Sequence, residues 1–168
     1  MFAENKLQLN DSWLFSAYQK HLPIWTAGFE DSTIGNMIVA KKELAMLPGY
    51  SFVMNGLEQM SSLTNWYMSE RKKKEIGFFQ IGGGISGDFA LCVVPLIVND
   101  LGIDIKAWSL FTQISDSTTS YGSFSGALPK EKITWNKINQ DTPMHSINSD
   151  ATIVFPIWAL AVLDALNL

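Results

Sequence analysis

The alternation of apolar and polar positions near the start of the chain predicts a helix followed by a short strand. An amphipathic helix is expected over residues 12–22, with Asn10 or Asp11 as its cap and Pro23 near its end. The stretch 23–27, PIWTA, has the composition of a short strand. Just beyond it, the segment FEDSTIGNM offers Asp31 and Ser32 as caps for another helix.

A longer helix is expected after Asn55, which has the side chain of a good helix cap. Leu57, Met60 and Leu63 recur there at roughly helical spacing, which predicts that they share one face. The helix should end in the basic run 71–74. Cations in a last helical turn complement the helix dipole, so a solvated role for this run is favoured over a patch that binds a partner.

The next stretch has the order strand, helix, strand. Residues 76–81 form a short apolar and aromatic run that is typical of a buried strand, and glycines 82–84 follow it. Residues 88–102 are predicted to be helical and residues 107–114 to form a second strand. This βαβ arrangement predicts an α/β protein, Rossmann-like, with three layers and a mostly parallel sheet.

The rest of the chain contains a long polar loop, a weak strand and a closing helix. The loop spans 115–129, the strand 144–149, and the helix begins at Asp150. That helix is apolar on most faces, which predicts burial in the core or between subunits. With no repeat and no linker, residues 1–168 are expected to form a single domain.

Composition narrows the class of protein. Hydrophobic residues make up 47% of the chain and charged residues 17%, which is typical of an apolar globular protein. A net charge of −4 argues against general nucleic-acid binding and leaves room for a cationic ligand. Cys92 is the single cysteine, so a reducing, cytoplasmic location is expected, and the apolar stretch around it is too short to span a membrane. The two histidines lie apart, and no metal site is assigned.

Two stretches carry candidate chemistry. Gly82, Gly84 and Gly87 spell G-x-G-x-x-G at a strand-to-helix turn, a pattern that either holds a nucleotide phosphate or forms a tight, closely packed turn. A nucleotide site of this kind has an acidic residue about 20 positions later, a place that Asp104 meets only ambiguously.

The second stretch, SGALPKEKITWNKI, follows the long polar loop and brings Glu131, Trp135 and Lys137 close together. For an amine ligand, a carboxylate would pair with an ammonium, an indole face would contact a cation, and a partly desolvated lysine amine would form an imine. Alternatively, Glu131 and Lys137 are solvated neighbours, and the Lys137 stem lies over the Trp135 ring.

Taken in order, the segments DSTIGNM, GGG, SGALPKEKITWNKI and SDATIVFP resemble deoxyhypusine synthase and its bacterial relatives over most of the chain. The resemblance implies an NAD-dependent enzyme that oxidises spermidine. It implies that the aminobutyl group passes to a lysine as an imine and then to a lysine of a hypusine-bearing translation factor. A small amine acceptor, as in the formation of homospermidine, is an open alternative.

The resemblance assigns roles to individual residues. Lys137 falls on the family's imine-forming lysine, with Asn136 in place of a glycine, while Trp135 and Glu131 match polyamine-site residues. The positions implied to contact NAD are Gly82, Gly83, Gly84, Asp116, Ser117, Asp150 and Ala151.

The chain departs from the family in its polyamine pocket. Phe124 stands where the synthase has an aspartate, and Asp88 stands where it has a histidine. Gly122 and Ser123 are expected in the same pocket. Because one carboxylate is lost and another gained, we expect the amine to bind in a shifted position, or a different polyamine to be used.

The resemblance covers only the C-terminal half of a family chain. The sequence is therefore expected to be a fragment, one part of a split enzyme, or a protein that has lost the reaction. Family members form tetramers with shared active sites, so a second chain or a homo-oligomer is expected to complete the site. A non-catalytic subunit is the alternative from another functional class.

Overall fold

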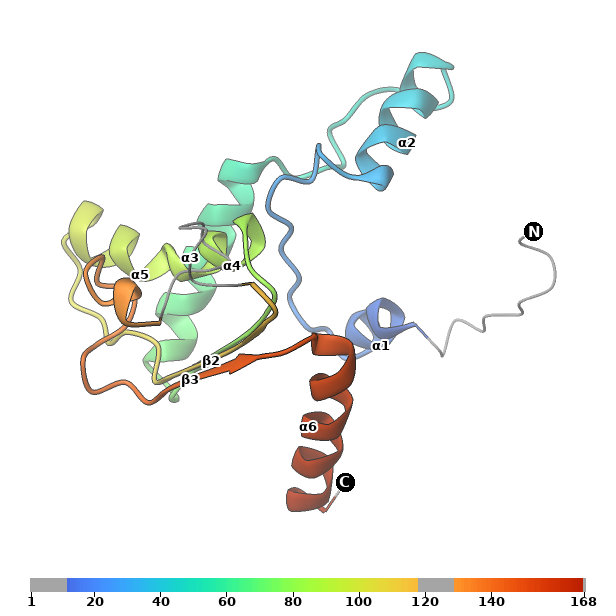
Figure 1. Cartoon of the computed structure of the whole chain (residues 1–168). Helices are drawn as coiled ribbons and strands as arrows, with labels where there is room; N and C mark the ends of the chain where they lie inside the picture. The colour runs from blue at the N-terminus through green and yellow to red at the C-terminus, as the bar shows by residue number, and fades with distance from the viewer. Residues whose placement is uncertain (1–11, 118–128, 168) are drawn as a thin grey trace.

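The structure is a computed structural model, and it describes residues 12–117 and 129–167. Its elements follow one another along the chain as shown in Figure 1. The helices, in chain order, are α1 (Trp13–Gln19), α2 (Thr33–Glu43), α3 (Gly56–Arg71), α4 (Ile85–Leu91), α5 (Val93–Pro95), the π-helix η2 (Leu96–Asp100), the 3-10 helix η4 (Pro129–Lys132) and α6 (Ala151–Ala165).

Three parallel strands form the sheet. β1 (Gly77–Ile81) pairs with β2 (Leu110–Ser115), which pairs with β3 (Met144–Asn148), so the order is β1-β2-β3. In the register, Phe78 lies opposite Phe111, and Ile114 lies opposite Ile147. Parallel neighbours need crossover connections, and helices α4, α5 and η2 provide the one between β1 and β2. The predicted α/β class and parallel sheet are confirmed.

The hydrophobic core lies between this sheet and helices α3 to η2. Tyr67 of α3 and Phe111 of β2 are completely buried, and the Tyr67 ring lies edge-on to Trp108 with centroids 4.6 Å apart. The Phe78 ring contacts Trp108 at 5.1 Å and stacks on Phe111 at 5.8 Å. Edge-to-face and stacked aromatic pairs of this kind add to the stabilisation that burial gives.

Helix α3 begins where Asn55 predicts it. The Asn55 side chain accepts hydrogen bonds from the backbone of Leu57 and Glu58, and the Glu58 carboxylate accepts one from the Asn55 backbone, which completes a capping box. Leu63 is buried, but Leu57 is 84% exposed, so the predicted apolar face does not include the first turn. The helix ends at Arg71, earlier than the end of the basic run.

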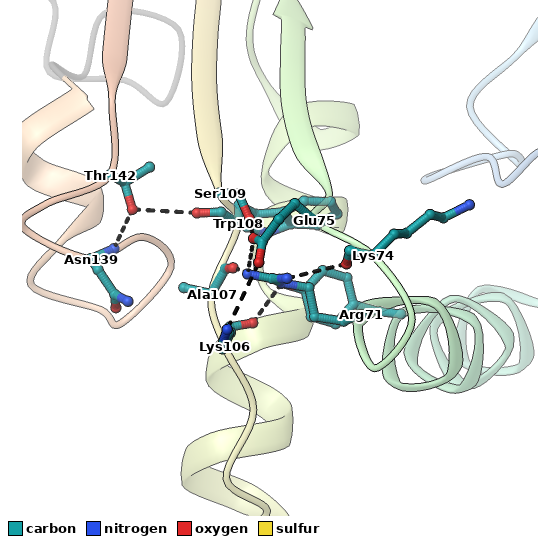
Figure 2. A network of polar contacts seen from close by, with 10 residues as sticks. Arg71, Lys74, Glu75, Lys106, Ala107, Trp108, Ser109, Asn139 and Thr142 are labelled. Carbon is teal, nitrogen blue, oxygen red and sulfur yellow. Dashed lines mark hydrogen bonds and ion pairs between the residues drawn. The ribbon is translucent and has the colours of Figure 1, made fainter.

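Arg71 fixes the end of α3 to the segments that lead into the sheet (Figure 2). Its side chain is only 5% exposed, and its guanidinium donates to the carbonyls of Ala107 (3.1 Å) and Lys74 (3.2 Å) and pairs with Glu75 at 2.6 Å. The Glu75 carboxylate also accepts a hydrogen bond from Ser109. One buried cation therefore ties the segment before β1 to the segment before β2.

Two expectations for the N-terminal part are wrong. Ser12, rather than Asn10 or Asp11, caps α1, because its hydroxyl accepts from the Phe15 amide at 3.3 Å. Residues 23–27 form no strand, since this segment lies beside α3 instead of the sheet and its polar groups bond to α3. The Trp25 indole donates to Ser62, for example, at 3.2 Å.

The single helix predicted over 88–102 is divided in the structure into α4, α5 and η2. Pro95 explains the change of hydrogen-bond pattern, because it has no N–H to donate to the preceding turn. The helix continues after it with π-type spacing, and the Leu101 amide donates to the Leu96 carbonyl at 3.0 Å.

Helix α6 begins at the predicted cap Asp150 but is not buried in the core of this chain. None of its described residues is buried, and Ile157 and Leu160 are 66% and 67% exposed. Its contact with the sheet is made by Trp158, which stacks on Phe79 at 4.2 Å, and by Phe155. Within the ranges 12–117 and 129–167, no helix is long and apolar enough to cross a membrane.

Candidate functional site

The three strands end at one edge of the sheet, and the residues predicted to contact a cofactor lie there. Glycines 82–84 follow β1, residues 116–117 follow β2, and residues 150–151 follow β3. The carboxyl edge of a parallel sheet is where α/β proteins bind their ligands. The sheet thus places all seven predicted positions at the edge where a ligand is expected.

The turn after β1 needs its glycines for two different reasons. Gly82 and Gly84 have φ of +75° and +80°, and a Cβ on either would meet no atom within 4 Å. Gly87 is close-packed, because a Cβ there would lie 2.9 Å from the Gln80 side chain. Gln80 in turn donates to the Gly82 carbonyl at 2.8 Å. The turn is therefore open at Gly82 and Gly84 and tightly packed at Gly87, which is how the three glycines of a dinucleotide-binding turn divide their roles.

Asp150 has a capping role that needs no ligand, and Asp104 lies away from the glycine turn. The Asp150 carboxylate accepts hydrogen bonds from the Thr152 amide at 2.8 Å and from the Thr152 hydroxyl at 2.7 Å. Both hydrogen bonds lower the pKa of Asp150, and the one from the hydroxyl has the larger effect. Asp104 lies in a hollow with Arg71, Glu75 and their neighbours, before the start of β2. Asp104 is therefore not placed to contact a ribose, because the start of β2 lies at the opposite edge of the sheet from the glycine turn.

Lys137 lies in a turn after η4, and its side chain points into the protein. The preceding Asn136 has φ of +58°, a left-handed conformation that asparagine tolerates better than most residues. The Lys137 side chain is 10% exposed, and its ammonium forms an ion pair with the Asp88 carboxylate of α4. Two residues predicted for the same site, 49 positions apart in the sequence, are therefore in direct contact.

Asp88 also contacts a thiol. Cys92, one helical turn further along, lies with its Sγ 3.5 Å from the second carboxylate oxygen of Asp88. Burial raises the pKa of the Cys92 thiol. A neutral thiol at this distance donates a weak hydrogen bond to the carboxylate, so both Asp88 oxygens have partners.

The other predicted substrate residues are less enclosed. Trp135 is 70% exposed and Glu131 is exposed, so in this chain neither residue is enclosed in a pocket with Lys137. Gly122, Ser123 and Phe124 lie outside the described residues.

Sequence reasoning missed Lys132, a second buried lysine in the same turn. It is 8% exposed, and its Nζ lies 4.7 Å from the centroid of the Phe111 ring. In the part of the chain that the structure describes, this Nζ has no hydrogen-bond partner. No spacing rule marks Lys132, although its position beside the apolar Ile133 and close to Lys137 was visible in the sequence.

An aromatic hollow of about 540 Å³ lies between the segment 25–34 and helices α3 and α4. Its walls include Trp25, Trp66 and Trp108, and Asp31 and Ser86 supply polar groups. Ser86 follows the glycine turn, so the hollow adjoins the candidate cofactor edge. Among the described residues, no group of three acidic, histidine or cysteine side chains is placed to hold a metal ion.

Comparison with known proteins identifies relatives along nearly the whole chain. The family model described as deoxyhypusine synthase matches residues 3–162. A deoxyhypusine synthase-like protein from a Nostoc species is 28% identical over 96% of this chain. Probable deoxyhypusine synthases from Archaeoglobus fulgidus and Ignicoccus hospitalis are 26% and 28% identical over 89% and 92% of it. The matched regions are only 42%, 46% and 45% of those three proteins, so the chain spans less than half the length of these relatives.

Proposed function

The chain belongs to the deoxyhypusine synthase family, and from this we propose that it takes part in the NAD-dependent transfer of an aminobutyl group from spermidine or a related polyamine. Lys137 is the amine that receives the group. The observation that carries the proposal is the placement of Lys137, buried in a turn and paired with a carboxylate from another element. A lysine held in this way is shielded from water and fixed in position, as an imine-forming amine must be.

The reaction at Lys137 begins with loss of a proton, because an ammonium has no lone pair. The neutral nitrogen then bonds to the carbon of the oxidised polyamine, and the C–N bond to the departing amine breaks. With spermidine, the departing amine is 1,3-diaminopropane. Asp88 holds Lys137 as an ion pair in the free site, so an arriving polyamine ammonium competes for the same carboxylate.

The carboxyl edge of the sheet fits the cofactor that the family uses. The open glycine turn would hold the cofactor's phosphates, with residues 116–117 and 150–151 from the neighbouring strand ends lying along the same edge. When bound, NAD would supply the hydride acceptor for the amine oxidation and the hydride donor for the final reduction. We place this chemistry in the cytoplasm, where the single cysteine is expected to stay reduced.

The acceptor of the aminobutyl group is a lysine of a hypusine-bearing translation factor or a small free amine, as in homospermidine formation. The exposed Trp135 and Glu131 support an open approach to the site for either acceptor. We infer that another chain, or another copy of this one, completes the site, because the match covers less than half of the relatives. A supporting, non-catalytic subunit is the second candidate, and the same coverage favours it.

The test uses the natively purified protein together with any chain that co-elutes. Incubation with NAD and spermidine should release 1,3-diaminopropane, and Lys137→Met should abolish the release. Lys130→Met is the matched control, since Lys130 is an exposed lysine in the same segment. Release that is unaffected by Lys137→Met would exclude Lys137 as the acceptor. No release by the native preparation would favour the supporting subunit.

A further inference from the structure

The environment of Lys132 favours an uncharged amine. Its Nζ is buried, lies against the face of Phe111 and has no hydrogen-bond partner in the described structure. An ammonium has three donors, and a ring face replaces only part of the hydration that burial removes. An unpaired buried charge is far more costly than an unpaired neutral amine, so the neutral form is the one this site stabilises.

Among the described residues, the groups around Lys132 come from its own segment and from α4, β2 and β3. Its own segment supplies Lys137 and Glu131, and α4 supplies Asp88, with Cys92 next to that carboxylate. Phe111 is the contact from β2. On β3, which also packs against η4, Met144 faces the core, so the neighbouring His145 lies on the other side of the strand.

These surroundings act on Lys132 in opposite directions. Burial lowers the pKa of Lys132, and the positive charge of Lys137 lowers it further. The carboxylates of Glu131 and Asp88 act against this shift, but the net direction is downward. The downward direction agrees with the contacts of the described residues, among which no anionic group forms a hydrogen bond with the Lys132 amine.

The backbone keeps the two lysines together. The Lys137 amide donates to the Lys132 carbonyl at 3.1 Å, and both side chains are buried. Lys137 is therefore ion-paired with Asp88, and its charge acts on Lys132, whose surroundings favour a neutral amine. An imine-forming lysine must lose a proton, and a nearby neutral amine is a suitable base.

We propose that Lys132 takes up, through one bridging water molecule, the proton that Lys137 loses before imine formation. The proposal deepens the proposed function and rests on it for the identity of the substrate. The N–H bond of Lys137 breaks with its electron pair left on nitrogen, and the lone pair of Lys132 forms the new N–H bond. The Lys137 lone pair then bonds to the substrate carbon, and the Lys132 ammonium returns the proton to the departing amine. Lys132 therefore acts as a general base toward Lys137 and as a general acid toward the departing amine.

The test uses propanal with cyanoborohydride, so that imine formation is measured without NAD or spermidine. Peptide mapping gives the rate at which Lys137 is alkylated as a function of pH in the native protein. We expect Lys132→Met to slow this rate by about tenfold or more near pH 7. The difference from the wild type should shrink as the pH rises. Added trimethylamine, which forms no imine with propanal, should partly restore the rate in Lys132→Ala. Lys130→Met should keep the wild-type profile.

A pH profile for Lys132→Met that coincides with the wild-type profile would overturn the proposal. We expect Lys132→Met to melt at or above the wild-type temperature, because an apolar side chain replaces a buried amine. If that variant fails to fold, NMR titration of wild-type protein carrying ¹³C at the lysine Cε measures the charge of Lys132 directly. A Lys132 that is charged throughout the neutral range would overturn the proposal. Loss of spermidine cleavage alone, with the propanal results as expected, would remove the proposed function and leave the role of Lys132 intact.

Discussion

Among single residues, Tyr67 makes the stability of the folded chain depend on pH. Its ring is fully buried, its hydroxyl donates to the Lys106 carbonyl at 2.9 Å, and burial raises its pKa to about 12. Between about pH 10, where an exposed tyrosine ionises, and pH 12, the folded state keeps a proton that the unfolded state loses. The free energy of unfolding should therefore fall by about 1.4 kcal/mol per pH unit from this residue as the pH rises through that window.

Urea unfolding of the wild type and of Tyr67→Phe at several alkaline pH values measures this contribution. The variant should be less stable near neutral pH, because the Lys106 carbonyl loses its donor, and its stability should decline less steeply above about pH 10. Parallel declines for the two proteins would show that Tyr67 is not the group responsible.

The residues of the candidate site differ in how far sequence could find them. Asp88 and Lys137 were selected from the family resemblance, and the fold brings them into contact. Lys132 was missed, because a buried lysine has no sequence pattern of its own and depends on the ring of Phe111 from a distant strand. Trp135 was expected against an amine, but nothing in the short stretch around it determines whether an indole is covered.

At the scale of elements, the packing of α4 against β1 determines the shape of the glycine turn. Gly87→Ala would place a methyl group 2.9 Å from the Gln80 side chain, whose amide holds the Gly82 carbonyl. We expect a loss of about 1–3 kcal/mol in the free energy of unfolding and weaker NAD binding, because Gln80 must move and release the turn.

Gly56→Ala is the matched control for this substitution. Gly56 is the first residue of α3, and a Cβ there would meet no atom within 4 Å. Its stability should stay the same or rise slightly. Chemical unfolding and a direct NAD-binding titration provide both comparisons. Equal effects of the two substitutions would contradict the packing role of Gly87.

The elements themselves were largely predictable where local signals and tertiary contacts agree. The three strands and the starts of α3 and α6 lie where apolar runs and capping residues indicate them. The strand expected at 23–27 failed because strand formation needs a neighbour, and this segment lies beside α3. The division of the helix around Pro95 follows from the missing N–H, although the π-type continuation cannot be predicted from composition.

At the scale of the whole molecule, helix α6 exposes an apolar surface that predicts assembly. Ile153, Ile157 and Leu160 on this helix are 63%, 66% and 67% exposed, and Figure 1 shows α6 projecting away from the helices that cover the sheet. Large apolar side chains exposed together on one helix are typical of an interaction site. The sequence predicted that this helix is buried in the core or between subunits. In the structure, none of its described residues is buried in the core of this chain.

Light scattering of the natively purified protein should give a mass above the 18.7 kDa of one chain. The double substitution Ile157→Ser and Leu160→Ser should shift the mass toward one chain and leave the circular dichroism of the fold unchanged. Leu57→Ser is the control, because Leu57 is 84% exposed but stands apart on the first turn of α3. A wild-type protein that runs as one chain would contradict the assembly.

We propose that Lys137 receives the aminobutyl group. The most direct test is tandem mass spectrometry of the native protein after incubation with NAD and spermidine and reduction with borohydride. We expect one added aminobutyl group on the peptide that carries Lys137, located on that residue and dependent on NAD. An adduct located on Lys132 or Lys130, or protein that stays unmodified in the presence of NAD and its co-eluting chains, would contradict it.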